Sequence, residues 1–593
     1  MASLLPVTVA ERAAIAGTEM LNVSPDALIT SAVPVAATRR TPRDSKRSLQ
    51  TSKDPPAILI YRPNHFQKCV PMNHQDRLIG TSLPPASGPV SNKKSADLYR
   101  RGQAHLDAGQ HFEALQCYLR IAKIIPNSWD AAFRCGVLLF ELQRCEEALS
   151  FLDRCQKLRS EHGPTFYMRA RTLRMMRRFE EAIVVSEQAE VLAPNDPDVF
   201  NNTGIILHCL CRDKDAVDRF DRAILLRPQF FDAINNKANA LVQLQRFTEA
   251  LSCYSAAKSL APDDTTIDWN VAYLRMVTGD FAAGWVGRES RWTKKAAPVP
   301  YPKLPTPMWL GQESVAGKTI LVYADEGLGD TIQFARYLPL LAAHGARVVL
   351  VADEALHCLM SRLPGVALFV PKSDGATVPR FDLHCALSSL PLAFCTRLDT
   401  IPSARAYFPP VAAEKRQAWE ARLGDRHGMR IGLAWSGNQR HVNDHNRSVP
   451  LNMMARLVTG DAQFISLQKD PRPADRTVLR ERSDIADHTS HMSDFSATAA
   501  LISCLDLVIT VDTSVAHLAA AFGRPTWVPL PYTPDYRWLL DRDDSPWYPT
   551  VRLFRQDETR DYETVIDRVH AELAKQIRSI GSAPLDQPHE VRR

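Results

Sequence analysis

A chain of 593 residues is long enough for roughly two to four domains, each with a substantial core. Its hydrophobic content of 45% and charged content of 23% are ordinary for a globular protein. A net charge of +6 over this length is too mild to predict a nucleic-acid partner. No apolar run approaches the roughly 18 residues of a membrane span. We therefore expect neither a nucleic-acid-binding protein nor a membrane-spanning one.

The 12 cysteines occur singly, without CxxC pairs or Cys/His clusters at zinc-ligand spacing. Such cysteines are typical of reduced, buried thiols. The opening residues lack a basic segment followed by a continuous apolar core, so no secretory signal is expected. These features predict a cytoplasmic protein that holds no metal.

Residues 1–94 are rich in Pro, Ser, Thr and Ala, without sustained periodicity, and predict a disordered leader. The basic residues between Arg39 and Arg47 are either a solvated charge run or a patch for targeting or an anionic surface. Met72 is an alternative start to Met1.

A period of 34 residues begins near Ser95. One position of the period is always alanine, and a second is always glycine or alanine. The first series is Ala114, Ala148, Ala182, Ala216 and Ala250, and the second is Gly102, Gly136, Ala170, Gly204, Ala238 and Ala272. Small residues at two fixed positions allow paired helices to approach closely, so the period predicts stacked helix pairs over 95–285.

This pattern resembles the tetratricopeptide repeat family, with five units over about 95–264 and a capping unit after them. The resemblance implies an α-solenoid with a concave groove. Asn201, Asn235 and Asn239 fall on the first helices of successive repeats. Their amides either hold an extended peptide, as an asparagine ladder does in some members of that family, or form hydrogen bonds between helices.

Residues 286–316 are expected to be a connector. Trp292, Tyr301 and Trp309, together with Trp285 just before it, make this stretch aromatic. Aromatic side chains cover a large area at low entropic cost. We therefore expect the segment to attach the solenoid to the domain that follows it.

From Gly317 the pattern changes to short apolar runs separated by helical stretches, which is typical of βα units in a parallel sheet. The runs form two series: 318–323, 347–352, 366–370 and 381–387, then 430–435, 463–468, 505–510, 526–531 and 551–555. The second series predicts a separate sheet, joined to the first by a helix over 415–423. We expect a Rossmann-like lobe over 317–412, a second over 413–580 and a short tail over 581–593, so the fold class is α plus α/β.

In the first lobe, Gly327 and Gly329 follow the first strand and precede Asp330. The third glycine of a dinucleotide fingerprint is missing, so NAD binding and a dehydrogenase are poorly supported. Asp330 is expected at the N-cap of the next helix. It is either only that cap or a base that takes the proton of an acceptor hydroxyl at the edge of a cleft.

In the second lobe, Ser436 and Asn438 follow the first strand in a turn whose amides suit an anion. Arg447 is expected near the same strand end, where a guanidinium would bind diphosphate oxygens. Gln468 and Lys469 end the next strand and either reach a base or ribose or form a plain turn.

The stretch 505–531 reads as strand, tight turn, helix and strand. Such a turn places free amides and the positive end of a helix dipole at the carboxyl edge of a sheet, where phosphates bind. Thr513 and Ser514 are expected to meet phosphate or sugar, and Asp512 to hold sugar hydroxyls. His517 is expected on the helix face towards the cleft, either as a ligand-contacting residue or as a satisfied core histidine.

GLGDTIQFARYLPLL (327–341) and VDTSVAHLAAAFGRP (511–525) resemble two segments of the heptosyltransferases that use ADP-heptose, which have two facing Rossmann-like lobes (the GT-B fold). The resemblance implies that Asp330 is the base and that Asp512, Thr513 and His517 grip a nucleotide-sugar donor. Helical repeats joined to this fold resemble protein O-GlcNAc transferases. The expected function is a glycosyltransferase that needs no metal or cofactor beyond a nucleotide-sugar co-substrate.

The acceptor, a protein or a glycan, would be selected by the repeats. The Asp541-x-Asp543 pair is interpreted as an acidic turn rather than a metal site. The alternative function is a non-catalytic scaffold of tetratricopeptide repeats with a degenerate transferase module.

Overall fold

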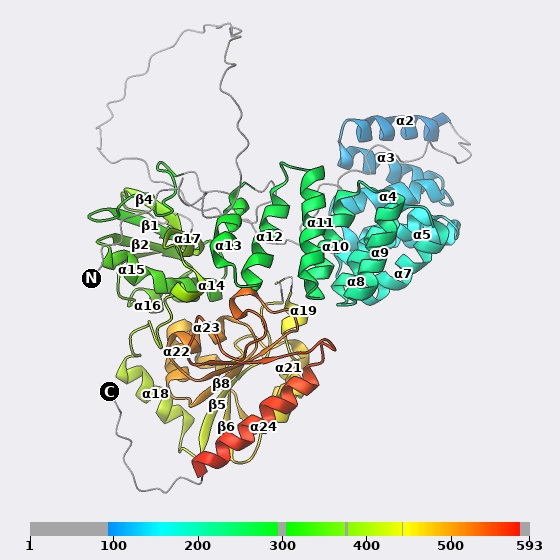
Figure 1. Cartoon of the computed structure of the whole chain (residues 1–593). Helices are drawn as coiled ribbons and strands as arrows, with labels where there is room; N and C mark the ends of the chain where they lie inside the picture. Colours follow the sequence, from blue (N-terminus) through cyan, green and yellow to red (C-terminus); the bar gives the residue numbers. More distant parts are fainter. Residues whose placement is uncertain (1–92, 294–303, 374–376, 440, 442, 582–593) are drawn as a thin grey trace, which may run out of the picture.

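The computed structural model describes residues 93–293, 304–373, 377–439, 441 and 443–581. A helical solenoid runs from α2 to α13 and ends beside two α/β lobes (Figure 1). The predicted α plus α/β fold class is thereby confirmed. Residues 1–92 of the expected leader, Tyr301 and nearly all of the tail lie outside the described residues.

The solenoid consists of antiparallel helix pairs that follow the 34-residue period. Its helices are α2 (Lys93–Asp107), α3 (His111–Ile124), α4 (Trp129–Glu141), α5 (Cys145–Leu158), α6 (Gly163–Met175), α7 (Phe179–Leu192), α8 (Pro197–Cys209), α9 (Asp213–Leu226), α10 (Phe231–Gln243), α11 (Phe247–Leu260), α12 (Thr265–Val277) and α13 (Phe281–Arg288). The small residues do bring the helices of a pair together. A Cβ atom on Gly204 of α8 would lie 2.5 Å from the Phe220 ring of α9.

The turn inside each helix pair repeats as well. A residue with positive φ recurs every 34 residues: Gly109, Gln143, Arg177, Cys211, Gln245 and Gly279. Several of these turns lie against the C-terminal lobe. Gln245 donates to the Tyr532 carbonyl at 2.9 Å, and Arg560 of the lobe pairs with Asp213 at 2.6 Å. One edge of the solenoid is therefore fixed to the lobe.

The N-terminal lobe has a four-stranded parallel sheet in the order β3-β2-β1-β4. Its strands are β1 (Thr319–Tyr323), β2 (Arg347–Ala352), β3 (Val366–Pro371) and β4 (Leu383–Ala386). Its α-helices are α14 (Leu328–Phe334), α15 (Leu338–Ala343), α16 (His357–Met360) and α17 (Leu390–Ala393). All four predicted strands are present, with ends shifted by at most two residues.

The C-terminal lobe has a six-stranded parallel sheet in the order β10-β9-β8-β5-β6-β7. The strands are β5 (Met429–Ala434), β6 (Ala462–Ser466), β7 (Ile485–Ala486), β8 (Leu507–Thr510), β9 (Thr526–Leu530) and β10 (Val551–Arg555). The helices are α18 (Ala413–Leu423), α19 (Asp444–Arg447), α20 (Leu451–Met454), α21 (Pro473–Glu481), α22 (Phe495–Ser503), α23 (Ser514–Ala521) and α24 (Tyr562–Gly581). Sequence analysis did not predict β7, which has only two residues.

The junction of the solenoid and the lobes is an aromatic core. Trp285 of α13 is 2% exposed and packs against Phe281, Phe334, Tyr536 and Trp547 with ring centroids 5.8 to 6.3 Å apart. These rings come from the solenoid, the N-terminal lobe and the C-terminal lobe. The expectation that aromatic residues attach the solenoid is confirmed at Trp285.

Helical structure continues into the expected connector, because α13 ends at Arg288 and a 3-10 helix, η2, spans Glu289–Trp292. Within the described residues, no helix is both long enough and apolar enough to cross a bilayer.

Candidate active site

Two loops predicted to face each other across the lobes do meet. Helix α14 follows β1, helix α23 follows β8, and the two helices pack together. A Cβ atom on Gly329 would lie 2.9 Å from Cδ2 of His517, so the absence of a side chain there allows the approach. The carboxyl edges of the two sheets thus come together at α14 and α23.

Asp330 is not the N-cap of α14, contrary to the prediction. Gly327 occupies the N-cap, and Asp330 lies at the third helical position, where its Oδ2 accepts from the Gly327 amide at 3.1 Å. This bond is the half of a capping box in which the third helical residue accepts from the N-cap amide. Its Oδ1 forms an ion pair with Arg537 Nη2 at 2.5 Å.

Arg537 is a charged residue of this site that sequence analysis missed. It lies in the 3-10 helix η9 (Tyr536–Trp538), between Asp330 and Asp535, and its Nε is 3.2 Å from Asp535 Oδ1. Burial alone would raise the pKa of Asp330, but the cations Arg537 and Arg288 lower it. Asp330 is therefore held as a carboxylate and bonded at both oxygens.

His517 is 1% exposed in α23. Its Nδ1 bonds the Tyr548 hydroxyl at 2.8 Å, and its ring stacks on Trp538 with centroids 5.6 Å apart. Its Nε2 has no hydrogen-bond partner among the described residues and lies 3.9 Å from Asp512 Oδ1. Burial, reinforced by Arg537, lowers the pKa of His517 well below its usual value, so the imidazole is neutral.

The turn before α23 is as predicted, with Thr513 at the N-cap and its Oγ1 accepting from the Val515 amide at 3.3 Å. Ser514 is the first residue of the helix. Arg447 reaches this turn from the second-lobe loop and donates to the Asp512 carbonyl at 2.9 Å. The structure thus brings Arg447, Asp512, Thr513 and Ser514 together.

The remaining candidate residues of the second lobe do not all lie at one site. Gln468 turns inward, and its Oε1 accepts from the amides of Trp435 and Ser436 at 3.1 and 3.0 Å, so it supports the loop after β5. The Ser436 hydroxyl is buried without a hydrogen-bond partner among the described residues. The Asn438 carbonyl accepts from the His441 amide at 2.9 Å. Lys469 instead bonds the carbonyls of Thr489 and Met492, as in the alternative of a plain turn.

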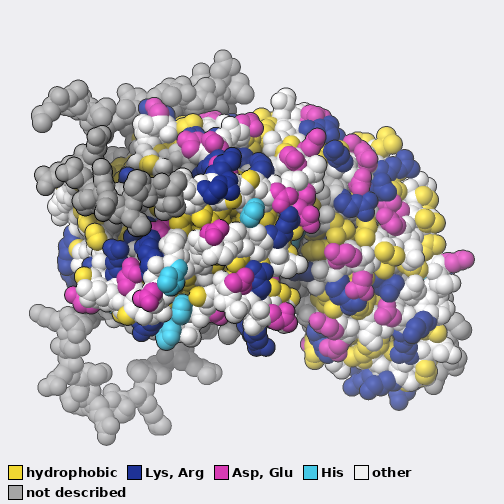
Figure 2. All heavy atoms as spheres, turned by 90° about the horizontal axis from the view of Figure 1, so that it is seen from below, with side chains coloured by type: hydrophobic (Ala, Val, Ile, Leu, Met, Phe, Trp, Pro, Cys, Tyr) yellow, Lys and Arg dark blue, Asp and Glu magenta, His cyan; other side chains and the backbone are white. Residues whose placement is uncertain are grey.

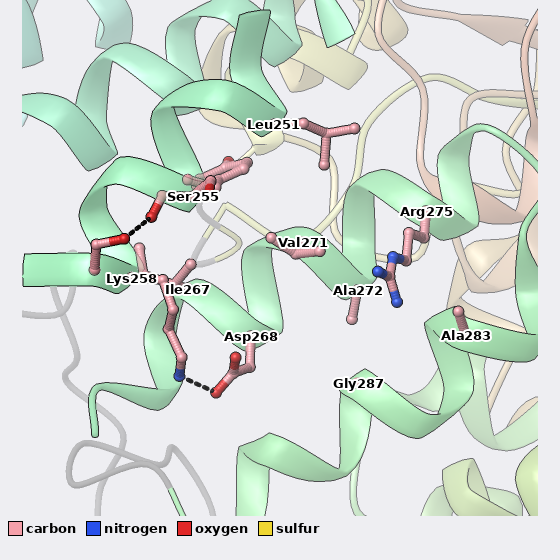
Figure 3. Close-up of a pocket in the computed structure, with 12 residues that line it drawn as sticks. Leu251, Ser255, Lys258, Ile267, Asp268, Val271, Ala272, Arg275, Ala283 and Gly287 are labelled. Carbon is pink, nitrogen blue, oxygen red and sulfur yellow. Dashed lines mark hydrogen bonds and ion pairs between the residues drawn. The ribbon is translucent and has the colours of Figure 1, made fainter. Parts of the chain in front are cut away.

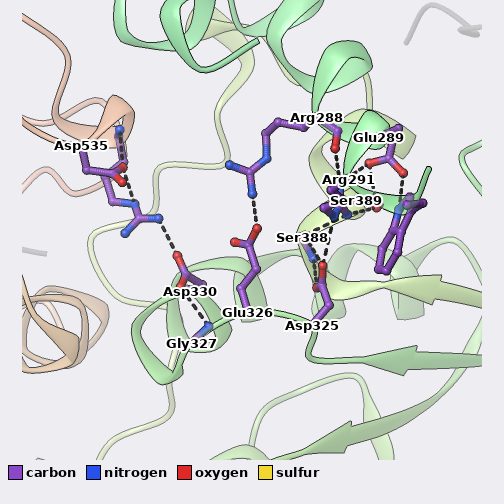
Figure 4. Close-up of polar contacts among 12 residues, drawn as sticks. Arg288, Glu289, Arg291, Asp325, Glu326, Gly327, Asp330, Ser388, Ser389 and Asp535 are labelled. Carbon is purple, nitrogen blue, oxygen red and sulfur yellow. Dashed lines mark hydrogen bonds and ion pairs between the residues drawn. The ribbon is translucent and has the colours of Figure 1, made fainter. Parts of the chain in front are cut away.

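A second set of charges lies beside Asp330 and was not identified from the sequence (Figure 4). Glu326, just before α14, pairs with Arg288 of α13. Asp325 accepts from the Ser388 amide and hydroxyl at 3.1 and 2.7 Å and lies 3.4 Å from Arg291. Arg288 and Arg291 belong to the end of the solenoid, so this module supplies two cations to the edge of the site.

The solenoid asparagines bond to one another. Asn236 donates to Asn201 at 3.1 Å, and Asn270 donates to Asn235 at 3.0 Å and to Asn239 at 3.3 Å. The side-chain oxygens of Asn201, Asn235 and Asn239 thus link neighbouring repeats, as in the alternative of hydrogen bonds between helices.

A cavity of about 480 Å³ lies between α11, α12 and α13 (Figure 3). Leu251 and Val271 are among its apolar lining, while Arg275 and the Lys258–Asp268 ion pair form its polar part. None of the predicted donor-site residues lines it. On the face seen in Figure 2, basic and acidic side chains are interspersed.

Among the described residues, no group of three or more His, Cys, Asp and Glu side chains is arranged to hold a metal ion.

Comparisons with known proteins agree with this division of the chain. Residues 491–530 match the family model for glycosyltransferase family 9 (heptosyltransferase), which here covers β8, α23 and β9. Residues 99–161 and 214–265 match the tetratricopeptide repeat model. The chain thus joins tetratricopeptide repeats to a module similar to glycosyltransferase family 9.

The chain is also similar to protein FlbA of Caulobacter vibrioides, with 25% identity over 342 residues. The match covers 54% of this chain and 56% of FlbA, so the chain spans little more than half the length of this relative.

Similar solved structures include MamA of Desulfovibrio magneticus RS-1, at 20% identity and a TM-score of 0.28, covering 28% of this chain and 96% of MamA. Another is YrrB, described as a TPR protein with an unusual peptide-binding site, at 19% identity and a TM-score of 0.27. That match covers 30% of this chain and 91% of YrrB. TM-scores of this size are too low to carry an argument about this chain.

Proposed function

We propose that this chain is a glycosyltransferase that moves a sugar from a nucleotide-sugar donor to an acceptor. The observation that carries the proposal is the meeting of α14 and α23 at the carboxyl edges of two parallel sheets. Helix α23 lies in the segment 491–530 that matches glycosyltransferase family 9. Ligands of open α/β sheets bind at such edges.

The donor would bind on the C-terminal lobe. Its diphosphate would face the amino end of α23, where backbone amides and the helix dipole attract anions. Arg447, already 2.9 Å from the Asp512 carbonyl, would add a guanidinium beside those oxygens. These groups would offset the charge of the leaving nucleoside diphosphate without a metal ion.

The acceptor would approach from the side of the N-terminal lobe and the solenoid. Its hydroxyl oxygen bonds to the anomeric carbon while the bond from that carbon to the diphosphate oxygen breaks, and the electron pair leaves with the nucleoside diphosphate. The proton of the hydroxyl passes to a carboxylate of the loop after β1, where Asp330 is the candidate from the sequence. The acceptor is a protein or glycan that the repeats select. A nucleotide-sugar is the co-substrate, and no cofactor takes part.

One observation favours the second candidate, a scaffold without catalysis. Both carboxylate oxygens of Asp330 are engaged, by Arg537 and by the Gly327 amide, so the expected base is not free. A degenerate module would retain such an ion pair as a structural element.

The test is a screen of UDP-, ADP- and GDP-sugars for transfer or hydrolysis, together with calorimetric titration of the nucleoside diphosphates. We expect binding by the full chain that weakens about tenfold or more in Thr513→Val, because the cap that orders the amino end of α23 is lost. Thr559→Val removes a hydroxyl bonded to an exposed aspartate outside the site and is the matched control. No binding by the folded wild-type chain up to millimolar nucleotide, with no product, would leave only the scaffold.

A further inference from the structure

Three carboxylates lie where β1 leads into α14 (Figure 4). Asp325 is bonded to Ser388, and the other two, Glu326 and Asp330, differ in what binds them. Asp330 is bonded at both oxygens, to Arg537 through Oδ1 and to the Gly327 amide through Oδ2. Glu326 is bonded at one oxygen, because its Oε1 pairs with Arg288 and its Oε2 has no hydrogen-bond partner among the described residues. The Glu326 side chain is 21% exposed, so its free oxygen is within reach of a ligand.

We propose that Glu326, rather than Asp330, takes the proton from the acceptor hydroxyl. This assignment rests on the glycosyl transfer proposed above. As the hydroxyl oxygen bonds to the anomeric carbon, its proton moves to the free Oε2 of Glu326, and the nucleoside diphosphate leaves with the electron pair of the broken bond. Glu326 then returns the proton to water.

The electrostatic surroundings of the two carboxylates suit this division. Burial raises the pKa of Glu326 to about 7; Arg288 partly offsets the rise, and the nearby Asp330 and Asp325 add to it. A base works best when its pKa is close to the working pH. Asp330 has the opposite shift, since Arg537 and other cations lower its pKa and make it a poorer proton acceptor.

Arg288 is the positioning residue of this arrangement. Its guanidinium lies over the rings of Trp269, Trp285 and Tyr536 at 5.1 to 5.7 Å, so three aromatic residues hold it in place. It belongs to α13, at the end of the solenoid. The repeats would therefore hold the reacting carboxylate as well as select the acceptor.

Asp330 then has a different task. It holds Arg537 in place, with Asp535 on the other side of the same guanidinium. The charged or titratable groups around Glu326 come from five places: Arg288 on α13, Arg291 on η2, Asp325 beside it, Asp330 on α14, and Tyr536 on η9. The pKa of Arg288 and that of Tyr536 are raised and that of Asp330 is lowered, so none of these three groups titrates near pH 7, whereas the pKa of Glu326 is raised to about 7.

The experiment compares Glu326→Gln, Glu326→Asp, Asp330→Asn and the wild-type full chain. Hydrolysis of UDP-, ADP- and GDP-sugars, with water in place of the acceptor hydroxyl, is followed from about pH 5 to about pH 9. Glu354→Gln is the matched control, because that glutamate is an exposed residue of the same lobe. Calorimetric titration with the nucleoside diphosphates and the unfolding temperature are measured for every variant.

We expect Glu326→Gln to lower kcat by about 10² to 10⁴, the usual contribution of a general base, with nucleotide affinity unchanged. The wild-type rate should fall as the pH drops below about 7, where Glu326 becomes protonated. This acid limb of the pH–rate profile should be absent in Glu326→Gln. Glu326→Asp should recover part of the rate. Asp330→Asn should keep the fall in rate at low pH but move it to lower pH, because the Asp330 charge helps to raise the pKa of Glu326.

A Glu326→Gln variant with full kcat and an intact acid limb overturns the assignment, as does an Asp330→Asn variant in which the limb alone is lost. A wild-type chain that binds no nucleotide overturns the proposed function itself and the assignment with it. If Glu326→Gln unfolds at a much lower temperature, Glu326→Asp decides instead. Its rate should decline at a different pH from that of the wild type if the carboxylate is the base, and an unchanged pH dependence overturns the assignment.

Discussion

Replacing Trp285 by alanine tests whether the solenoid and the two lobes share one core. Trp285 is 2% exposed, and its ring meets Phe281 of its own helix, Phe334 of the N-terminal lobe, and Tyr536 and Trp547 of the C-terminal lobe. Truncating a buried tryptophan costs about 3–5 kcal/mol because the cavity collapses only in part. The aromatic contacts across modules, each about 0.5–1.5 kcal/mol, place the loss near the upper end of that range.

The assay is amide hydrogen exchange, since a chain of several domains does not unfold in two states. Trp285→Ala should accelerate exchange together in α13, α14 and η9, because each packs on the same side chain. The matched control is Trp527→Ala, which removes a tryptophan that is 7% exposed and packs with Phe554 inside the C-terminal lobe. The control should accelerate exchange in that lobe alone. Faster exchange confined to α13 in Trp285→Ala would refute the shared core.

Three further predictions concern stability. Gly523→Ala should cost about 1–3 kcal/mol in thermal unfolding, because φ is +70° there and a Cβ would lie 2.8 Å from a backbone oxygen, whereas Gly460→Ala meets no atom within 4 Å and should cost little. Arg560→Met should cost about 1–3 kcal/mol and speed proteolysis at the solenoid turns, because the buried Asp213 carboxylate then keeps His208 alone as a partner; unchanged cleavage would contradict the docking role. Burial keeps His517 neutral in the folded chain, whereas the unfolded chain binds a proton there below about pH 6.5. The free energy of unfolding should therefore fall by up to about 1.4 kcal/mol for each pH unit below that value. His517→Gln should reduce this pH dependence, and an unchanged slope would refute the reasoning.

The solenoid could be predicted from the sequence because its contacts are local and repeat. Three glycines of the period each face a side chain of the partner helix 16 residues later: Gly102 faces Tyr118, Gly136 faces Leu152 and Gly204 faces Phe220. The two helices of one repeat therefore contain the residues that determine how they pack against each other. The central parallel strands could be predicted because β4, β5, β8 and β9 are short runs buried along their whole length. The two-residue β7 is too short to give such a signal.

The site was only partly predictable because its charge pairs join distant segments. Arg537 and Asp330 are 207 positions apart, and nothing in either neighbourhood indicates the other. Glu326 was not singled out beside the glycines, and Arg288 fell in the expected connector, although the structure places it in α13. For Lys469 the sequence left open a ligand contact and a plain turn, and the structure gives the side chain two carbonyl partners.

Hydrogen exchange of the wild-type chain with and without UDP, ADP and GDP tests the donor site most directly. If the donor binds at the carboxyl edges of β5 and β8, at least one nucleotide should slow exchange over 435–448 and 511–518. Protection at both segments is the predicted result. Protection confined to α11–α13, around the cavity lined by Leu251 and Arg275, or no protection at millimolar nucleotide, would contradict it.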